Sequence, residues 1–237
     1  MKAFIVKLMP STARLSLPAP GVSSELLIRR RVLLMMAAGL MSCGPRRPRS
    51  WDLLSAEWLP HWSAAGIEGE GAVTLSPGSL RLEQGQPMTG ARFSPDWQAA
   101  GLPLIDYAIS FEARRVEGRD FFATLTFPVG ELDRCLSWVV GGWGGTVVGI
   151  SSVDHADASE NSTRGEMAFE QGRWYRLRLE VRQTEVSAWI DDRPMVRLNL
   201  KGHHLGLRSG DIERTAPLGF ATWMTVGEVR SLRLTLL

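Results

Sequence analysis

The feature that most constrains the fold of this chain is a two-residue alternation of apolar and polar side chains along its second part. In residues 107–114, tyrosine, isoleucine, phenylalanine and alanine alternate with alanine, serine, glutamate and arginine. The same period returns in residues 121–127, 174–181, 186–190 and 231–236. Successive side chains of a strand point to opposite faces, so these segments predict strands with one face on a core.

Turn-forming residues separate the alternating segments. Residues 76–78, 117–120 and 191–194 are rich in glycine, proline, serine and aspartate, which favour tight turns. No apolar run of helical period longer than about two turns occurs in residues 70–237. Roughly ten or more short strands in one domain favour a sandwich over a small barrel. We therefore predict an all-β fold, a two-sheet antiparallel sandwich.

The charge of the chain is divided unevenly between its two parts. Of the 237 residues, the first 50 contain nine lysines and arginines against one acidic residue, which gives this part a net charge of +8. The remainder contains 18 basic and 24 acidic residues and has a net charge of −6. The part predicted to fold therefore lacks the basic surface that nucleic-acid binding requires, and we expect no nucleic-acid partner.

The N-terminal part has the pattern of an export signal. Three arginines at 29–31 precede an apolar stretch at 32–42, too short to span a bilayer comfortably. Residues 40–44 then resemble the bacterial lipobox, in which a cysteine, here Cys43, is lipidated and becomes the new N-terminus. The alternatives are an ordinary signal peptide, or an uncleaved anchor with Cys43 incidental.

These patterns predict three regions and a location. Residues 1–43 form an N-terminal extension and lipoprotein signal peptide, residues 44–58 a linker, and residues 59–237 the β-sandwich. The protein is expected to be exported and held to a membrane of the cell envelope by the lipid on Cys43, on the periplasmic or outer-membrane face, or otherwise secreted.

Several segments of the predicted sandwich resemble a known superfamily. Residues 169–196 are similar to the signature hairpin of concanavalin A-like (LamG-type) jelly rolls, an aromatic-led strand followed by one ending in a short acidic turn. Residues 227–237 resemble the closing strand of the 3-keto-disaccharide hydrolase domain family, a branch of that superfamily. Residues 120–130 and 141–151 are similar to secreted bacterial relatives. The resemblance spans about residues 60–237.

The resemblance implies a concanavalin A-like jelly roll that acts on oligo- or polysaccharides, with cleavage of 3-keto-glycosides as the activity. Because the keto group acidifies the neighbouring C–H, one base and one stabiliser of negative charge would suffice for an elimination. Asp120 or His155 could be the base, Glu166 is a further acid–base candidate, and Arg208 or Arg214 could stabilise the charge. The Glu-x-Asp-x-x-Glu motif of laminarinase-type sandwich hydrolases is not present.

Tryptophans are the candidates for contacts with a sugar ring. Trp143 lies among glycines in residues 141–145, where it could form a platform for the apolar face of a sugar, or else fill the core while the glycines relieve crowding. Trp138, Trp189 and Trp223 are further candidates, and the alternation places Trp189 on the face opposite to its apolar neighbours.

The most polar segment is residues 151–166. Asp154, Asp157 and Asn161 could supply oxygen ligands to Ca²⁺, although aspartate and asparagine are also ordinary turn residues, so a solvated loop is the alternative. Asn161 is also a candidate sugar contact. The sequence pattern requires no cofactor.

Three functions therefore remain open: a keto-glycoside hydrolase, a non-catalytic glycan-binding lipoprotein, and a structural lipoprotein of the envelope. A pocket that brings a carboxylate or histidine to an arginine and a tryptophan favours the enzyme. A shallow groove with exposed tryptophan favours the binding module, and tryptophans confined to the core favour the structural protein.

Overall fold

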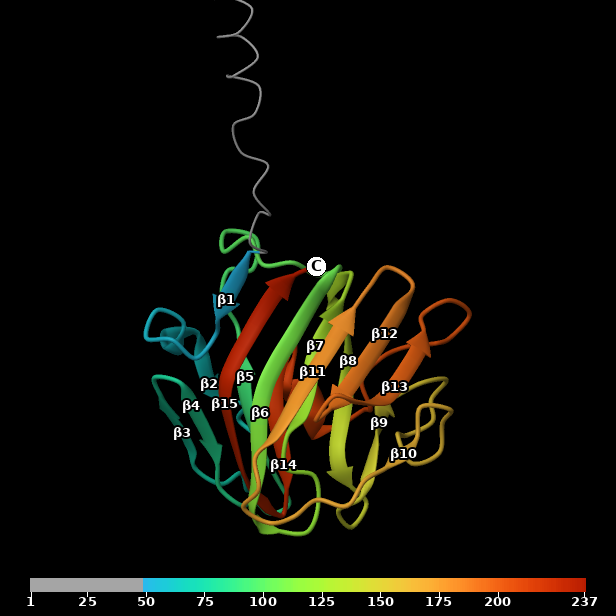
Figure 1. The fold of residues 1–237 in the computed structure, drawn as a ribbon. Helices are drawn as coiled ribbons and strands as arrows, with labels where there is room; N and C mark the ends of the chain where they lie inside the picture. Colours follow the sequence, from blue (N-terminus) through green and yellow to red (C-terminus); the bar gives the residue numbers. More distant parts are fainter. Residues whose placement is uncertain (1–48) are drawn as a thin grey trace, which may run out of the picture. The chain divides into compact units, whose positions relative to one another are not determined.

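In the computed structural model, which describes residues 49–237, the alternating segments form two antiparallel sheets that enclose a common core (Figure 1). Sheet A has eight strands in the order β13-β12-β11-β6-β15-β4-β3, with β1 also paired to β15. Sheet B has seven strands in the order β10-β9-β8-β7-β14-β5-β2. The all-β sandwich predicted from the period is thus confirmed.

The strands of sheet A are β1 (Ser50–Asp52), β3 (Val73–Ser76), β4 (Ser79–Leu82), β6 (Tyr107–Gly118), β11 (Tyr175–Val181), β12 (Glu185–Ile190), β13 (Arg193–Asn199) and β15 (Thr225–Leu236). Those of sheet B are β2 (Trp62–Ala64), β5 (Met88–Phe93), β7 (Thr124–Val129), β8 (Glu131–Gly142), β9 (Val147–Ser151), β10 (Gly165–Glu166) and β14 (Leu218–Trp223). Two 3-10 helices, η1 (Leu59–His61) and η2 (Asp211–Thr215), complete the described elements. In residues 49–237 no helix has the length and apolar character needed to cross a membrane.

The apolar positions of the alternation meet between the sheets. Ile109 and Phe111 of β6 point inward from sheet A, and Leu125 of β7 and Trp138 of β8 point inward from sheet B, all nearly or completely buried. The rings of Trp138 and Phe111 pack edge to face with centroids 6.4 Å apart. The prediction that Trp138 contacts a sugar is therefore wrong, because its strand phase turns the ring into the core.

The domain begins earlier in the chain than the sequence suggested. Strand β1 pairs with β15 through Trp51, and Leu53 and Leu54 are completely buried. Residues 50–58 therefore belong to the sandwich and are not a linker; the strand is three residues long, too short to display a period. The predicted signal peptide and Cys43 lie outside the described residues.

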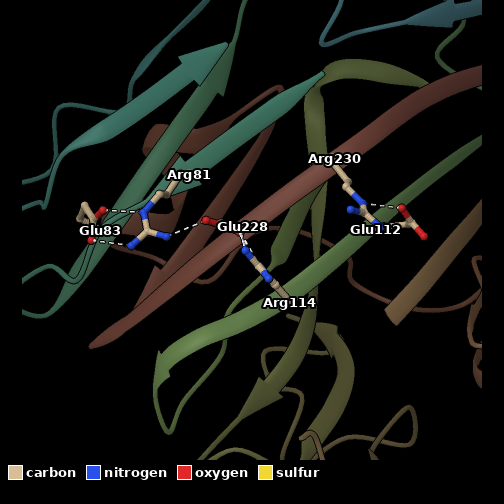
Figure 2. Close-up of polar contacts among 6 residues, drawn as sticks. All are labelled: Arg81, Glu83, Glu112, Arg114, Glu228 and Arg230. Atoms are coloured by element: carbon tan, nitrogen blue, oxygen red, sulfur yellow. Dashed lines mark hydrogen bonds and ion pairs between the residues drawn. The ribbon is translucent and has the colours of Figure 1, made fainter. Parts of the chain in front are cut away.

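The outward positions of sheet A carry mostly long charged side chains. They include Arg81, Glu112, Arg114, Arg176, Arg178, Glu180, Glu185, Arg197, Glu228, Arg230 and Arg233. These groups form ion pairs between neighbouring strands (Figure 2). Glu228 of β15 accepts hydrogen bonds from Arg81 of β4 and Arg114 of β6, both at 2.6 Å. Although burial opposes its ionisation, these two arginines hold the pKa of Glu228 below its usual value.

Two rows of outward positions in the middle of sheet B carry small side chains instead. A row that crosses four strands reads Gly219, Thr126, Ser137 and Ser151, and the next row contains Gly90, Ala221 and Thr124. Side chains of this size leave room for other segments of the chain to lie directly on the sheet.

Two segments use this room. Helix η2 lies on Gly219, where an added Cβ would be 2.5 Å from the carbonyl oxygen of Thr215, and the Thr215 hydroxyl is hydrogen-bonded to that of Thr126 at 2.6 Å. The loop after β9 lies on Gly149, where a Cβ would be 3.1 Å from the carbonyl oxygen of Ala158. The outward face of sheet B is thus covered in two places.

Candidate functional site

A pocket of about 440 Å³ lies on the outward face of sheet B, beside these two coverings. Its lining consists of Met88, Asp120, Phe121, Thr124, Ser137, Val139, Trp143, Ser151, Arg208, Ser209, Asp211, Ile212 and Trp223. Four of the residues predicted from the sequence, Asp120, Trp143, Arg208 and Trp223, therefore come together in one place.

Hydroxyl groups of three neighbouring strands contribute to the lining. The Ser137 hydroxyl donates to the carbonyl oxygen of Ser151 at 2.9 Å, and the Ser151 hydroxyl donates to Asp157 at 3.3 Å. The Thr124 hydroxyl is buried and has no hydrogen-bond partner among residues 49–237. Because an unpaired buried hydroxyl is unfavourable, Thr124 is the polar group of the pocket most in need of a ligand atom.

Asp120 follows β6 and has a fixed carboxylate. One oxygen accepts the backbone N–H of Phe121 at 2.8 Å, and the other accepts the backbone N–H of Gly144 at 3.0 Å. The backbone N–H of Asp120 in turn donates to the Thr225 hydroxyl at 3.1 Å. These contacts fix the orientation of the carboxylate and leave lone pairs on both oxygens for a further donor.

Aromatic side chains form an apolar part of the lining. Trp143 is in the turn between β8 and β9 and is 44% exposed. Trp223, at the end of β14, is half-buried and lies against Phe121 with ring centroids 6.1 Å apart. The buried Met88 is opposite Trp223 on the adjacent strand. Trp143 is thus the aromatic ring of the lining most accessible to a ligand.

The segment before and within η2 contributes Arg208 and Asp211. The Arg208 guanidinium is exposed, and its Nη1 lies 3.0 Å from Asp157 of the loop after β9. That loop and the Arg208 segment are also joined by a backbone hydrogen bond from Ser152 to Gly206 at 2.9 Å. Arg208 therefore reaches the pocket from a segment that is fixed to the loop beside it.

Buried Arg115 supports the turn that carries Trp143. It is 7% exposed, and its Nη2 donates to the carbonyl oxygen of Phe169 at 2.8 Å. Burial lowers its pKa. A Cβ on Gly145 would be 2.7 Å from its Nη1, so this glycine, two residues after Trp143, leaves the space that the guanidinium fills. The sequence analysis did not identify this residue.

Three of the predicted acid–base and charge-stabilising residues lie elsewhere. His155 is exposed and stacks on His204, with ring centroids 4.1 Å apart. Glu166 is exposed and paired with Arg164 at 2.6 Å, and Arg214 is exposed on η2. None of the three lines the pocket, so the structure does not bring them together with Asp120 and Arg208.

The residues predicted to bind calcium have separate partners. Asp154 accepts hydrogen bonds from the His204 backbone and pairs with the His203 ring at 2.7 Å, and these contacts lower its pKa, the His203 contact most. Asp157 pairs with Arg208. Among residues 49–237 no group of three or more histidines, cysteines, aspartates or glutamates is arranged to hold a metal ion.

Asn161 organises the loop after β9 and does not line the pocket. Its amide nitrogen donates to the carbonyl oxygens of Ile150 at 2.8 Å and Asp157 at 2.9 Å, and its amide oxygen accepts from the Thr163 hydroxyl at 2.6 Å. The side chain of Asn161 is thus engaged by β9 and by its own loop, and the structure does not bring it to the pocket. Trp189 lies on the other sheet, outside this pocket.

The sequence analysis missed the floor of the pocket. Thr124, Ser137 and Ser151 are polar positions of strands, and their alternation alone assigns them to solvent. The available signal was their size: these three positions carry serine or threonine, whereas the polar positions of residues 174–181 are mostly charged.

Chemically, the pocket combines a fixed hydrogen-bond acceptor, an unpaired hydroxyl, a guanidinium and an accessible aromatic ring. Its charged lining residues, Asp120, Asp211 and Arg208, give it a net charge of −1. It therefore suits a ligand that is uncharged or cationic, has both hydroxyl groups and an apolar face, and is small enough for about 440 Å³.

Comparisons with known proteins place the chain by fold. No family model matches it, and no curated protein matches it in sequence, so membership in the 3-keto-disaccharide hydrolase domain family stays a prediction. A Crh5 transglycosylase in complex with NAG superposes with a TM-score of 0.53 at 13% identity, covering 82% of this chain and 88% of that one.

Two further solved structures superpose similarly. A protein of unknown function with a galectin-like fold from Bacillus subtilis gives a TM-score of 0.52 at 11% identity, covering 79% of this chain and 94% of that one. The carbohydrate recognition domain of Emp47p gives 0.51 at 11% identity, covering 82% and 99%. The fold is a concanavalin A-like jelly roll. At these identities the likeness concerns the fold alone.

Proposed function

We propose that this protein binds carbohydrate, an oligo- or polysaccharide, in the pocket on the outward face of sheet B. The observation that carries the proposal is the convergence of Trp143, Asp120, Thr124 and Arg208 on one pocket. Two structures of the same fold, a carbohydrate recognition domain and a transglycosylase bound to NAG, also handle sugars, which supports this class of ligand.

Trp143 supplies the contact to the apolar face of a sugar ring. The axial C–H groups of a pyranose form a flat apolar patch, and an aromatic side chain packs well against such a patch. Trp143 is 44% exposed, so a bound ligand can bury part of its ring surface. Trp223, which lines the same pocket, is half-buried against Phe121 and so has less surface free for a ligand.

Asp120, Thr124 and Arg208 supply the polar contacts. A carboxylate with free lone pairs accepts from sugar hydroxyls, the Thr124 hydroxyl can donate or accept, and the guanidinium donates to ring or hydroxyl oxygens. A pocket of about 440 Å³ is at the small end of ligand sites, so we expect it to hold one or two sugar rings.

The test is calorimetric titration of the full chain with a panel of neutral mono- and disaccharides, alone and with variants. For the saccharide that binds, we expect Trp143→Ala to lower the affinity about tenfold and Asp120→Asn to lower it about fivefold. Leu132→Ala is the matched control, because Leu132 is 43% exposed and lies outside the pocket. If both pocket variants bind like the wild type, the ligand is elsewhere and the proposal fails.

Cleavage of a 3-keto-glycoside is the second candidate, favoured by the presence of a fixed carboxylate and a guanidinium in the same pocket. Asp120 would take the proton from the carbon beside the keto group, and that electron pair would form a double bond as the glycosidic C–O bond breaks. The leaving oxygen takes up the proton that Asp120 removed, and addition of water across the double bond completes the hydrolysis. Arg208 would stabilise the enolate charge that develops on the keto oxygen.

Incubation with 3-keto-disaccharides separates the two candidates. Release of free sugar that is lost in Asp120→Asn would support the enzyme, since the amide cannot accept the proton. Binding in the first experiment without release in this one would leave the binding module.

We also propose that the domain is exported and held to a membrane by the lipidated Cys43. Ser50, the first residue of β1, follows Cys43 by seven residues. A segment of that length spans at most about 25 Å, which would keep the domain near the membrane surface. Labelling of cells with a palmitate analogue should mark the wild type and not Cys43→Ser; equal labelling of both would contradict the anchor.

A further inference from the structure

A second hollow, of about 610 Å³, lies on the other side of the sandwich, on the outward face of sheet A. Its lining consists of Ser110, Phe111, Glu112, Arg176, Leu177, Arg178, Trp189, Asp192, Ser231 and Arg233. No residue of this lining belongs to the pocket on sheet B, so the two are separate places.

The hollow exists because a short side chain interrupts a row of long ones. The register across β15, β6, β11 and β12 aligns Arg233, Ser110, Arg178 and Trp189 in that order. Ser110 therefore leaves a depression between Arg233 and Arg178. A bulge in β15 between Arg230 and Arg233 adds Ser231 to the same depression.

Several arginines on this sheet are paired at short distance with carboxylates outside the hollow or at its rim. In Figure 2, Arg81 contacts Glu83 and Glu228 at 2.6 Å each, and Arg230 contacts Glu112 at 2.6 Å. Glu112 is thus one of the two acidic residues that line the hollow and is already neutralised from its far side. The other, Asp192, is paired with Arg176 at 2.8 Å.

The arginines of the hollow keep unused donors. Arg233 has one carboxylate within 4 Å among the described residues, Asp52, at 3.8 Å, which is beyond hydrogen-bond distance. Arg178 uses Nε and Nη2 on a single oxygen of Glu180, and no contact within residues 49–237 occupies its Nη1. Arg176 donates only through Nη2, to Asp192. Three guanidinium groups therefore face one depression with donors to spare.

Trp189 adds an aromatic surface to these donors. It stands beside Arg178 across the β11–β12 pair and is half-buried, with its ring on the outward face. The charged lining, three arginines against Glu112 and Asp192, has a net charge of +1, opposite in sign to the pocket on sheet B. Forked guanidinium donors beside an aromatic ring match a ligand that has both anionic groups and rings.

We propose that this hollow is a second binding site, which takes an anionic saccharide that carries carboxylate or sulfate groups. The anions lie against Arg178, Arg233 and Arg176, and one sugar ring packs on Trp189. The site acts independently of the pocket on sheet B, so it does not depend on the function proposed for that pocket.

The test is titration of the full chain with trigalacturonate, with its neutral methyl ester, and with a sulfated trisaccharide of the same length. We expect the two anionic probes to bind and the ester to bind at least tenfold more weakly, and binding to weaken as salt is added. The two anionic probes distinguish a uronic-acid ligand from a sulfated one.

Variants then assign the site. Arg233→Gln and Arg178→Gln should each weaken binding roughly fivefold, and Trp189→Leu by a similar factor. Arg197→Gln is the matched control: Arg197 is an exposed arginine of the same sheet face, paired with Glu185 outside the hollow. Asp120→Asn should also leave this binding unchanged. Thermal unfolding of each variant checks that it is folded.

Two results would overturn the proposal. If neither anionic probe binds at millimolar concentration, anionic saccharides are excluded as ligands of the hollow. Equal weakening by Arg197→Gln and Arg233→Gln shows a general attraction to basic side chains and no defined site.

Discussion

On the outward face of sheet A, long charged side chains stand on every central strand, whereas two rows in the middle of the outward face of sheet B carry glycine, alanine, serine and threonine. On sheet A the charges pair across strands, as Glu228 does with Arg81 and Arg114, and they keep the face in water. On sheet B the small side chains allow η2 and the loop after β9 to lie on the sheet.

This difference explains how the pocket on sheet B and the hollow on sheet A are formed. The pocket on sheet B lies beside segments that cover the sheet, so its walls come from parts of the chain that are distant in sequence, such as Asp120 and Arg208. On sheet A the hollow is a gap in a layer of side chains, and its walls come from neighbouring strands. Substitutions should therefore be costly on sheet B and tolerated on sheet A.

The largest effect is expected from Gly219→Ala. An added Cβ would be 2.3 Å from the carbonyl oxygen of Ala91 and 2.5 Å from that of Thr215, so β5 and η2 would both have to move. We expect the free energy of unfolding to fall by about 3 kcal/mol, measured by urea titration. Gly206→Ala is the control, since no atom lies within 4 Å of its added Cβ. Equal stability of the two variants would show that η2 does not depend on close contact with the sheet.

A smaller effect is expected from Asn161→Asp. The carboxylate cannot donate to the carbonyl oxygens of Ile150 and Asp157 that the amide now binds, and it would repel them. We expect a loss of about 2 kcal/mol. In the control Asn199→Asp the side chain acts only as an acceptor, for the Lys201 backbone, and aspartate can accept equally well. A loss in both variants would contradict the role given to the amide.

On sheet A, Glu228→Gln should have a smaller and pH-dependent effect. The pKa of Glu228 is lowered from its ordinary value of 4.5, so its stabilising contribution is present at neutral pH and is lost as the pH falls through the lowered pKa. We expect a loss of about 1 kcal/mol at pH 7 that disappears once the pH is below the lowered pKa of Glu228, measured by thermal unfolding across pH. Glu131→Gln, at an exposed position, is the control and should change the free energy of unfolding at pH 7 very little. A loss that persists at low pH would point to packing and not to charge.

The smallest effect is expected from Arg197→Gln. The pair with Glu185 is exposed to solvent, with Arg197 82% exposed, so water replaces it at little cost. The midpoint of thermal unfolding should change by less than about 1 °C. A larger fall would show that the charges on sheet A act as a cooperative network, and would narrow the contrast between the two faces.

Part of the site could be predicted from residue type alone. Asp120, Trp143, Arg208 and Trp223 were identified because carboxylate, aromatic and guanidinium groups are the usual ligand contacts, and they do line the pocket. The same reasoning failed for Trp138, which is buried in the core. Residue type does not reveal which face of a strand points outward when both faces are partly buried, as they are in β8.

The residues of the loop after β9 show a second limit. Three residues there have side chains suited to catalysis or metal binding, yet each is used in contacts that hold the loop. His155 stacks on His204, Asp154 accepts from the His204 backbone, and Asn161 donates to the Ile150 carbonyl oxygen. The conformation of this loop depends on its packing over Gly149 and on the hydrogen bond from the Ile150 backbone to the Thr163 hydroxyl. These contacts join residues separated in the sequence, so the pattern of the loop alone does not reveal them.

The sequence by itself determined the all-β sandwich, because the period of two follows from the geometry of a strand and needs no partner to be read. It also placed Asp120, Trp143, Arg208 and Trp223 among the candidate ligand contacts by their residue type. Only the tertiary structure decided that the small face is covered by η2 and the loop after β9, and that Asp120, Thr124 and Arg208 meet there. The physical reason is that strand period is a local property, whereas a pocket is formed by contacts between segments far apart in the sequence.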